Sequence, residues 1–320
     1  MAPAMQCSRP MRRPLQHTAP TDGRGLPLPS PERRRQGARF GDYELVAPLA
    51  RGGMGGVYLA SHATTGERVA LKVLDPLFAN HAEVVSRLYS EHTISIRATH
   101  PGLVDIRAAA RTCDGVPYLV MEYLDGRTLA SILDEAELDI VTIIGLGAQI
   151  AAALAALHEV GVIHCDVKPE NLFVLDARAW GTLPQVKVID FGVSRRVDEP
   201  PADEASIAGT PAYMAPEQWK GQPCTASDVY ALGCVLYELV TGDPPFDGSL
   251  PQLMLAHLEQ RPARPTWLRA GLPIGLERVM LRALAKDPAL RPTMRELAHE
   301  LGDLADAMSV SATMPMAVAV

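Results

Sequence analysis

The chain has 320 residues, a hydrophobic content of 48% and a net charge of −7. This length fits one large two-lobed domain or two small domains, and the apolar fraction is enough for a sizeable core. The acidic balance argues against broad binding of nucleic acids or of membrane surfaces. The five cysteines form no C-x-x-C pair, which indicates reduced thiols of a cytoplasmic protein rather than a disulfide framework or a zinc site.

The first 38 residues contain seven prolines and seven arginines. Because proline fixes φ and removes a backbone donor, this segment is unsuited to a regular helix or a central strand. We expect a disordered basic tail, which is either a plain solvated extension or a docking arm for an acidic partner. The segment also lacks the apolar stretch that is typical of a secretory signal.

From Phe40 onward, short runs rich in Val, Leu and Tyr alternate with Gly-rich or polar turns. This pattern predicts a series of antiparallel strands. The predicted strands cover residues 43–50, 55–62, 68–74 and 116–124. Between the third and the fourth, residues 82–97 carry apolar side chains at helical spacing, which places Glu91 on or beside the apolar face of a helix.

Beyond Leu124 the pattern becomes mainly helical. Residues 140–157 are almost uncharged over a length that raises the question of a membrane span. Their polar Gln149 and their many alanines instead favour a buried core helix, and we expect it to end at Gly161. Further helices are predicted to begin at Ser227-Asp228 and to run from Pro292 to about Leu304.

The chain therefore divides into a β-rich lobe and a larger helical lobe, which is an α+β architecture. The expected segments are a tail over 1–38, a small lobe over 39–122, a large lobe over 123–304 and a C-terminal tail over 305–320. A cleft between two such lobes is a usual place for a ligand.

Residues 51–57 (RGGMGGV) lie between two predicted strands. Glycines let backbone N–H groups approach phosphate oxygens, although the same run also fits an ordinary tight turn. Lys72 lies in an apolar strand, where its charge is costly unless it is paired. Glu91 is a natural partner, and a solvent-facing lysine on an edge strand is the simpler alternative.

Residues 164–171 (HCDVKPEN) bring three polar side chains together. The Asp166 carboxylate suits orientation of a hydroxyl, Lys168 suits neutralisation of developing charge, and the Asn171 amide oxygen suits Mg²⁺. Asp190 ends an apolar strand and is followed by Gly192, which is a usual arrangement for a carboxylate that binds a hard cation. Taken alone, each of these segments also fits a plain polar turn.

The set of motifs resembles the eukaryotic-like protein kinase family in its bacterial form, from about Phe40 to Leu304. The chain order and the spacing are far more specific than any single motif. The matching segments are LARGGMGGVYLA (49–60), VALK (69–72), Glu91, HCDVKPEN (164–171), DFG (190–192), AGTPAYMAPE (208–217), SDVYALG (227–233) and DPALRPT (287–293).

The resemblance implies a bilobal protein-kinase fold and a catalytic set of four side chains. Lys72 would hold the phosphates of ATP and would itself be positioned by Glu91. Asp166 would orient the acceptor hydroxyl, and Lys168 would neutralise the γ-phosphate. Because a lysine occupies position 168 and the segment 209–211 reads Gly-Thr-Pro, the resemblance is to the serine/threonine branch.

The resemblance also implies ATP and Mg²⁺ as the ligands of the site. Asn171 and Asp190 would hold the metal. The nucleotide would be lined by Leu49, Gly52, Gly53, Gly55, Val57, Ala70, Lys72, Met121, Glu122, Leu124 and Phe173. Of these, the backbone of Glu122 and Leu124 would meet the adenine edge.

Several positions concern regulation and structure. Ala50 replaces the first glycine of the glycine-rich loop, which should tighten it. Cys165 replaces the arginine that usually precedes the catalytic aspartate, which puts control by loop phosphorylation in doubt. Ser206 is a candidate phosphosite with Arg195 or Arg196 as partners, whereas Thr210 is expected in the wall of the acceptor site.

Glu217 and Arg291 are expected to form a structural ion pair. His164 is read as a packed structural histidine, and Cys165 is not proposed as a nucleophile.

We therefore expect an active, cytoplasmic protein kinase that phosphorylates Ser or Thr in protein substrates and in itself. We expect no nucleic-acid partner and no membrane span, and a transient homodimer is the expected self-association. Two other classes fit part of the sequence: an ATP-binding pseudokinase scaffold, and a phosphotransferase for small molecules such as aminoglycosides. Residues 208–293 argue against the latter, because they resemble a platform for protein substrates.

Overall fold

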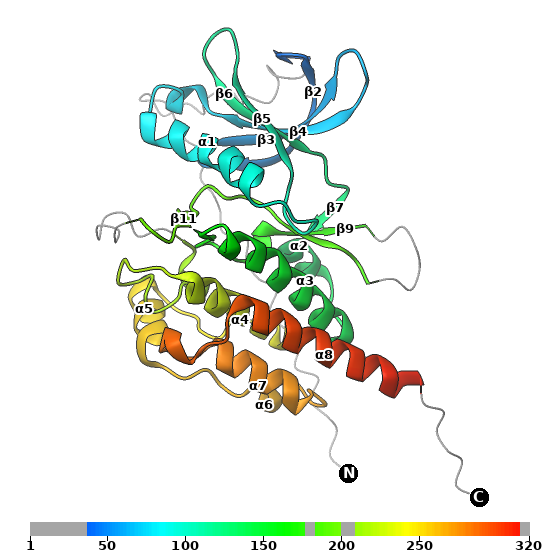
Figure 1. The fold of residues 1–320 in the computed structure, drawn as a ribbon, viewed down its shortest axis with the longest axis vertical. Helices are drawn as coiled ribbons and strands as arrows, with labels where there is room; N and C mark the ends of the chain where they lie inside the picture. The colour runs from blue at the N-terminus through cyan, green and yellow to red at the C-terminus, as the bar shows by residue number, and fades with distance from the viewer. Residues whose placement is uncertain (1–36, 177–182, 200–208, 314–320) are drawn as a thin grey trace, which may run out of the picture.

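The computed structural model describes residues 37–176, 183–199 and 209–313. They form a small lobe built on an antiparallel sheet and a larger helical lobe beneath it (Figure 1). The expected α+β class and the two-lobed architecture are thus confirmed. The predicted tail over 1–38 falls almost wholly outside the described residues.

The small lobe contains one six-stranded sheet with the order β1-β2-β3-β4-β6-β5. Its strands are β1 (Arg39–Phe40), β2 (Tyr43–Gly52), β3 (Gly55–His62), β4 (Arg68–Leu74), β5 (Ile106–Arg111) and β6 (Pro117–Glu122). The single-turn η2 (Pro76–Phe78) and helix α1 (Ala82–Arg97) lie between β4 and β5, and α1 packs on β5 and β6. Of these strands, β1 and β5 were not predicted.

The alternation of β4 decides which side chains face α1. Val69, Leu71 and Val73 join a small apolar cluster with the outer strands. Leu74 instead belongs to the main core, together with Val85 and Leu88 of α1. Because successive strand residues point to opposite faces, Lys72 shares the α1 side of the sheet with Leu74.

The large lobe consists of helices with short strands at its upper edge. The strands are β7 (Gly126–Thr128), β8 (Val162–Ile163), β9 (Leu172–Leu175), β10 (Val186–Val188) and β11 (Arg195–Arg196). The helices are α2 (Leu129–Glu135), α3 (Ile140–Glu159), α4 (Thr225–Thr241), α5 (Leu250–Glu259), α6 (Pro265–Leu268), α7 (Ile274–Ala283) and α8 (Met294–Thr313). Single turns are η3 (Pro169–Asn171), η5 (Pro211–Tyr213) and η6 (Pro288–Leu290).

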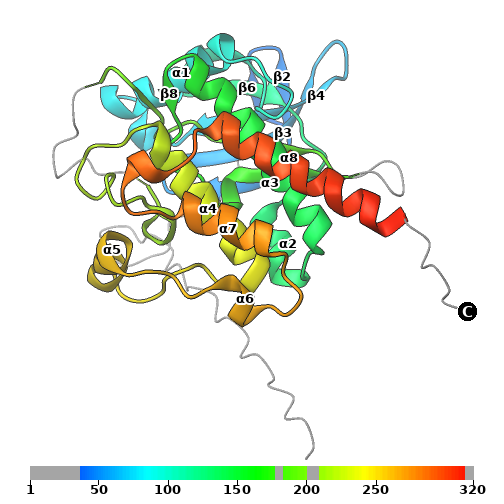
Figure 2. The ribbon, with the colours of Figure 1, turned by 60° about the horizontal axis from the view of Figure 1, so that its bottom comes forward.

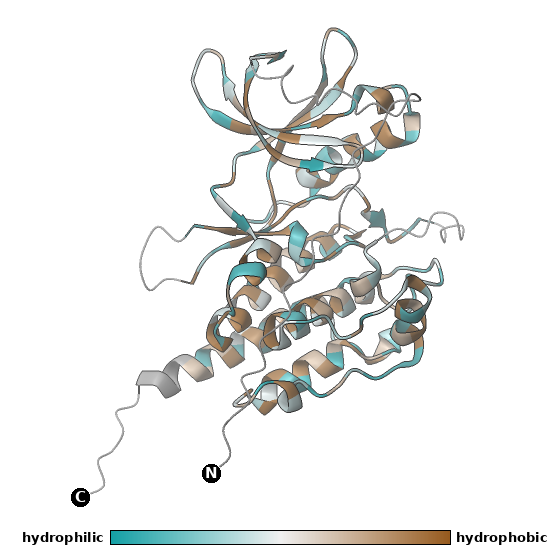
Figure 3. Cartoon of the chain, turned by 180° about the vertical axis from the view of Figure 1, so that it is seen from behind, coloured by the Kyte–Doolittle hydropathy of each residue, from teal (hydrophilic) through white to brown (hydrophobic). Residues whose placement is uncertain are grey.

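Helix α3 is the core of this lobe, and it packs against α4 and along α8 (Figure 2). Of the helices in the described residues, α3 alone is long and apolar enough to cross a membrane, and 61% of its most apolar stretch is buried in protein. Gly147 shows how close the packing is, because a Cβ there would lie 2.7 Å from Leu236 of α4. Apolar segments lie along the sheet and along these helices (Figure 3), as expected for a core helix.

Three helix boundaries differ from the sequence prediction. α3 ends at Glu159, and Gly161 follows with φ of +74° as the stop signal. α4 begins at Thr225, two residues before the expected start, because the Cys224 and Ser227 side chains cap its first turn. α8 begins at Met294 and continues to Thr313, nine residues beyond the expected end at Leu304.

Candidate active site

Lys72 of β4 lies at the centre of a charged cluster between the lobes. Its Nζ is 2.7 and 2.8 Å from the two carboxylate oxygens of Glu91 on α1, and 2.8 Å from Oδ1 of Asp190. The Glu91 side chain is 3% exposed, whereas that of Asp190 is 47% exposed. The structure therefore brings together three predicted site residues from three separate segments.

The surroundings of these groups give the two carboxylates different pKa values. Burial alone would lower the pKa of Lys72, but Glu91 and Asp190 outweigh burial and raise it. Burial raises the pKa of Glu91 to about 7, and Lys72 only partly offsets this rise. Burial likewise opposes ionisation of Asp190, yet the contact with Lys72 holds the pKa of this carboxyl below its usual value. Asp190 is thus the more readily anionic of the two.

The loop of residues 164–171 places Asp166 beside two polar partners. The Asp166 carboxylate accepts a hydrogen bond from the Thr210 hydroxyl at 2.7 Å and is 2.7 Å from Nζ of Lys168. Lys168 also donates to the Thr210 hydroxyl at 2.7 Å. Asn171 donates through Nδ2 to the backbone and the side chain of Asp166, at 2.9 and 3.1 Å. Its amide oxygen is therefore the atom left for a cation.

The loop is held from below by residues that sequence reasoning missed. Asp228 of α4 is 1% exposed and accepts hydrogen bonds from the backbone N–H groups of His164 and Cys165, at 2.8 and 2.9 Å. His158 Nε2 lies 2.8 Å from the same carboxylate. Burial alone would raise the pKa of Asp228, but these hydrogen bonds lower it. A carboxylate inside an otherwise apolar helix was the available signal, because such a charge must find partners.

Cys165 and Asp190 are the two non-glycine residues with positive φ in the described ranges, at +65° and +67°. Such conformations cost free energy and are retained only where the surroundings enforce them. Gln218 adds a hydrogen bond to the Cys165 carbonyl at 2.9 Å. Burial and the nearby Asp228 raise the pKa of the Cys165 thiol, so this cysteine is unsuited to act as a nucleophile.

His164 is fully buried and is packed, as predicted for a structural histidine. Its ring meets Phe191 edge to face, with centroids 5.9 Å apart. Its Nδ1 accepts a hydrogen bond from the Asp166 backbone N–H at 3.2 Å. The ring therefore connects Asp166 with the residue that follows Asp190.

The glycine-rich hairpin joins β2 to β3, with Gly52 paired to Gly55. A side chain at Gly52 or Gly53 would meet open space, whereas a Cβ at Gly55 would collide with the Val73 backbone carbonyl. Gly55 is thus required by the fold itself. Gly52 and Gly53 carry no such structural requirement, which agrees with an open edge that a ligand could approach.

The predicted adenine-lining residues come from both lobes. Val57 is paired with Lys72, and Ala70 with Met121, in neighbouring strands. Phe173 lies on β9 of the large lobe. Glu122 donates its backbone N–H to the Asp105 carbonyl at 2.9 Å, so contact with an adenine edge would fall to its own carbonyl.

Leu49 of β2 is 46% exposed, and Leu124 follows β6 and is partly buried. Leu49 lies at an irregularity of the β2–β3 pairing, whereas Leu124 lies beyond the end of β6.

Two further predictions concern the large lobe. Arg291 and Glu217 form the expected ion pair, with contacts of 2.6 and 2.9 Å. Ser206 lies outside the described residues. Its expected partners contact carboxylates, since Arg195 is bonded to Glu199 and Arg196 to Asp198.

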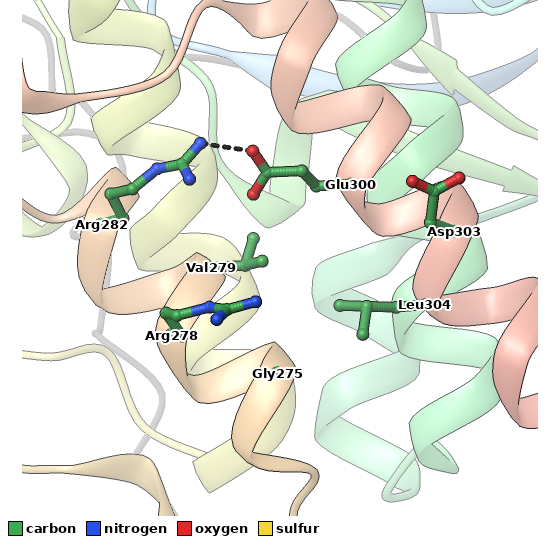
Figure 4. Close-up of a pocket in the computed structure, with 7 residues that line it drawn as sticks. All are labelled: Gly275, Arg278, Val279, Arg282, Glu300, Asp303 and Leu304. Atoms are coloured by element: carbon green, nitrogen blue, oxygen red, sulfur yellow. Dashed lines mark hydrogen bonds and ion pairs between the residues drawn. The ribbon is translucent and has the colours of Figure 1, made fainter.

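A separate hollow of about 310 Å³ lies between α7 and α8 at the far end of the large lobe (Figure 4). Arg282 and Glu300 are paired across it at 2.5 Å. It contains none of the predicted site residues. Its lining is Gly275, Arg278, Val279, Arg282, Glu300, Asp303 and Leu304.

Comparison with known proteins places this arrangement in a family. Residues 43–301 match the family described as "Protein kinase domain". The chain is 40% identical over 256 residues to the serine/threonine-protein kinase Pkn1 of Myxococcus xanthus, covering 79% of this chain and 36% of that protein. It is 38% identical over 285 residues to PkaA of Streptomyces coelicolor, covering 84% of this chain and 51% of that protein. The chain thus spans about half or less of the length of these relatives.

A solved structure with the same fold supports this family assignment. The PknI kinase domain of Mycobacterium tuberculosis matches with a TM-score of 0.64 and 28% sequence identity, over 84% of this chain and 98% of that one.

Proposed function

Because this chain belongs to the protein kinase family, we propose that it transfers the γ-phosphoryl group of ATP to serine or threonine hydroxyls of proteins. The observation that carries the proposal is the hydrogen-bonded set of Asp166, Lys168 and Thr210 in the catalytic loop and the facing segment. A hydroxyl is already held there between a carboxylate and an ammonium group. This is the pairing that an acceptor hydroxyl requires.

On this proposal, Asp166 orients the acceptor hydroxyl and accepts its proton as the new O–P bond forms, while the bond from the γ-phosphorus to the bridging oxygen breaks and ADP leaves. Lys168 lies 2.7 Å from Asp166, where its positive charge can stabilise charge that develops on the transferred group. The strict placement of both side chains matters, because phosphoryl transfer depends mainly on positioning and electrostatics.

On the nucleotide side, Lys72 would bind phosphate oxygens while Glu91 keeps its ammonium group in place. Gly52, Gly53 and Gly55 would cover the phosphates from the hairpin. The base would contact the remaining lining residues, which are Leu49, Val57, Ala70, Met121, Glu122, Leu124 and Phe173.

The residues present fit Mg²⁺. Within the described ranges no group of three or more His, Cys, Asp and Glu side chains could hold a metal. The donors Asn171 and Asp190 instead offer a small set of hard oxygens, as in sites where Mg²⁺ keeps waters and phosphate oxygens as its other ligands. When bound, the metal would neutralise charge on the phosphates.

The wider setting is also proposed. We infer cytoplasmic action on protein substrates, with ATP as the phosphoryl donor, no nucleic-acid partner and a transient homodimer as the self-associated form. The similarity to named serine/threonine kinases supports the substrate class.

Transfer of radiolabel from [γ-³²P]ATP to histone H1 tests the function. We expect labelling by the unaltered chain and a loss of at least about 100-fold in Asp166→Asn. Asp176→Asn is the matched control, because Asp176 is an exposed aspartate at the end of β9, and it should label normally. Equal labelling by Asp166→Asn would contradict the proposal.

Two other results would replace the proposal. Tight binding of Mg-ATP without any transfer would identify a pseudokinase. Labelling of an aminoglycoside panel, but of no protein, would identify a small-molecule phosphotransferase.

A further inference from the structure

His257 of α5 is a fully buried histidine beneath the segment that contacts the catalytic loop. Its ring packs edge to face against Phe246 and Tyr230, with centroids 5.0 and 5.7 Å apart. Its Nδ1 lies 3.0 Å from the Tyr230 hydroxyl. Tyr230 lies on the central helix α4, so the ring is fixed on two sides.

The hydrogen bonds around His257 determine where its proton lies. Lys286 donates to the Tyr230 oxygen at 3.1 Å, which leaves the hydroxyl proton of Tyr230 to be donated to Nδ1 of His257. Burial and the Lys286 cation lower the pKa of His257 to about 4, so the ring is neutral at neutral pH. A neutral ring that accepts at Nδ1 carries its proton on Nε2.

This Nε2–H is a buried donor, and such a donor is costly to leave unpaired. The backbone of Ala212 is the hydrogen-bonding group that it meets, and this contact favours protonation of the ring. The contact falls short of full hydrogen-bond geometry in the described part of the chain. Ala212 belongs to η5, which packs against α5.

The position of η5 bears directly on the acceptor side of the site. Thr210 immediately precedes η5, and its hydroxyl contacts both Asp166 and Lys168. At the other end of η5, the Tyr213 hydroxyl donates to Glu238 of α4 at 2.5 Å. Between these two anchors, Ala212 is the residue that faces His257.

We propose that His257 is a positioning residue for the protein substrate, because its Nε2–H holds the backbone of Ala212 and thereby segment 210–213 beside the acceptor site. The inference rests on the proposed kinase function. This contact contributes to the binding of the protein substrate. We expect little effect on the binding of ATP, because His257 contacts none of the residues that we assign to the nucleotide.

Two substitutions separate the hydrogen bond from the packing of the ring. His257→Phe keeps an aromatic ring against Phe246 and Tyr230 but removes both nitrogens. His257→Gln keeps an N–H donor and loses the ring. Tyr237→Phe is the control, because it removes a different hydrogen bond from the same α4 helix, to the Ala263 carbonyl.

Steady-state transfer to histone H1 measures KM for the protein, KM for ATP and kcat, beside the thermal midpoint of each variant. We expect His257→Phe to raise KM for histone about tenfold while KM for ATP stays within about twofold. His257→Gln should return KM for histone to within about threefold of the unaltered chain, and Tyr237→Phe should leave both constants unchanged.

An equal rise of both KM values in His257→Phe would overturn the inference, as would an unchanged KM for histone. A folded His257→Gln variant as impaired as His257→Phe would also contradict it. Absence of any transfer by the unaltered chain would overturn the proposed function, and this inference with it.

Discussion

Replacing Asp228 by asparagine tests what holds the loop of residues 164–171 in place. The buried carboxylate accepts hydrogen bonds from two successive backbone N–H groups of the loop, those of His164 and Cys165. It also contacts His158 Nε2. Asparagine has nearly the same shape, so the substitution changes hydrogen bonding and charge without opening a cavity.

The expected loss of stability follows from the backbone donors that lose their acceptor. The amide of asparagine offers one acceptor oxygen, so one of the two loop N–H groups must face an NH₂ group. An unsatisfied buried donor costs about 1–3 kcal/mol, and a bond to a neutral acceptor is weaker by about 1 kcal/mol than one to a carboxylate. We therefore expect Asp228→Asn to lower the free energy of unfolding by about 3 kcal/mol.

The kinetic effect should exceed the effect on nucleotide binding. The loop carries Asp166, and a displacement of about 1 Å of a catalytic group can cost about 100-fold in rate. We expect kcat to fall between about tenfold and 100-fold, whereas KM for ATP should change little because Lys72 and Glu91 do not contact Asp228.

Urea-induced unfolding and steady-state phosphorylation of histone H1 measure the two effects. Asp303→Asn, at an exposed position of α8, is the matched control and should behave as the unaltered chain. A stability loss below about 1 kcal/mol together with an unchanged kcat would refute the reasoning.

Three other substitutions test the large lobe. Glu217→Ala should lower the free energy of unfolding by about 3–5 kcal/mol. The reason is that the fully buried Arg291 side chain loses its counter-charge. Adding Arg291→Met should recover part of this loss, measured in the same urea titration. Cys165→Val should destabilise the chain by about 2 kcal/mol, because a β-branched residue is disfavoured at positive φ. Cys165→Gly should stay within about 1 kcal/mol of the unaltered chain. Equal urea midpoints for the two variants would contradict this. His257 has a pKa of about 4 in the folded chain, below its ordinary value, so its contribution to stability is complete above pH 6.5 and is lost as the pH falls. His257 should therefore contribute about 2 kcal/mol less to the free energy of unfolding at pH 5 than at pH 7.5, and the stability difference between the unaltered chain and His257→Phe should shift in favour of the variant by that amount over this range.

Periodicity explains why much of the fold could be predicted from the sequence. The alternation of β2, β3 and β4 and the helical spacing of α1 place Lys72 and Glu91 on facing surfaces, which the 2.7 Å contact confirms. Strand β5 reads IRAAAR, which has no alternation of apolar and polar residues and has Ile106 as its one β-branched residue, so no local pattern identifies it. Its pairing with β6 forms it instead.

Helix α8 continues further than we expected. Leu301 is fully buried, and Leu304, Ala305 and Met308 pack against the same core. The apolar helical spacing therefore extends beyond Leu304, and the helix runs on to Thr313. The sequence prediction ended the helix too early, although the spacing of Ala305 and Met308 was the available signal.

Asp228 illustrates what no local pattern contains. Its partners His164 and Cys165 are more than 60 residues away in the chain. The sequence indicates that a carboxylate in an apolar helix needs partners, but it does not say which donors will meet it. The resemblance to kinases identified the segment 227–233 without assigning this aspartate a role, and the three-dimensional structure supplied it.

Cys165 is held in the loop through its backbone. Its N–H donates a hydrogen bond to Asp228, and its carbonyl accepts one from Gln218. Its thiol also makes a long hydrogen bond to the Ile163 carbonyl at 3.7 Å. The two backbone contacts hold residue 165 next to Asp166, whose carboxylate lies beside Thr210 and Lys168. An arginine at this position would respond to a phosphate, whereas a buried thiol with a raised pKa has no charge with which to respond. The loop is thus held by Asp228 of α4 and by Gln218.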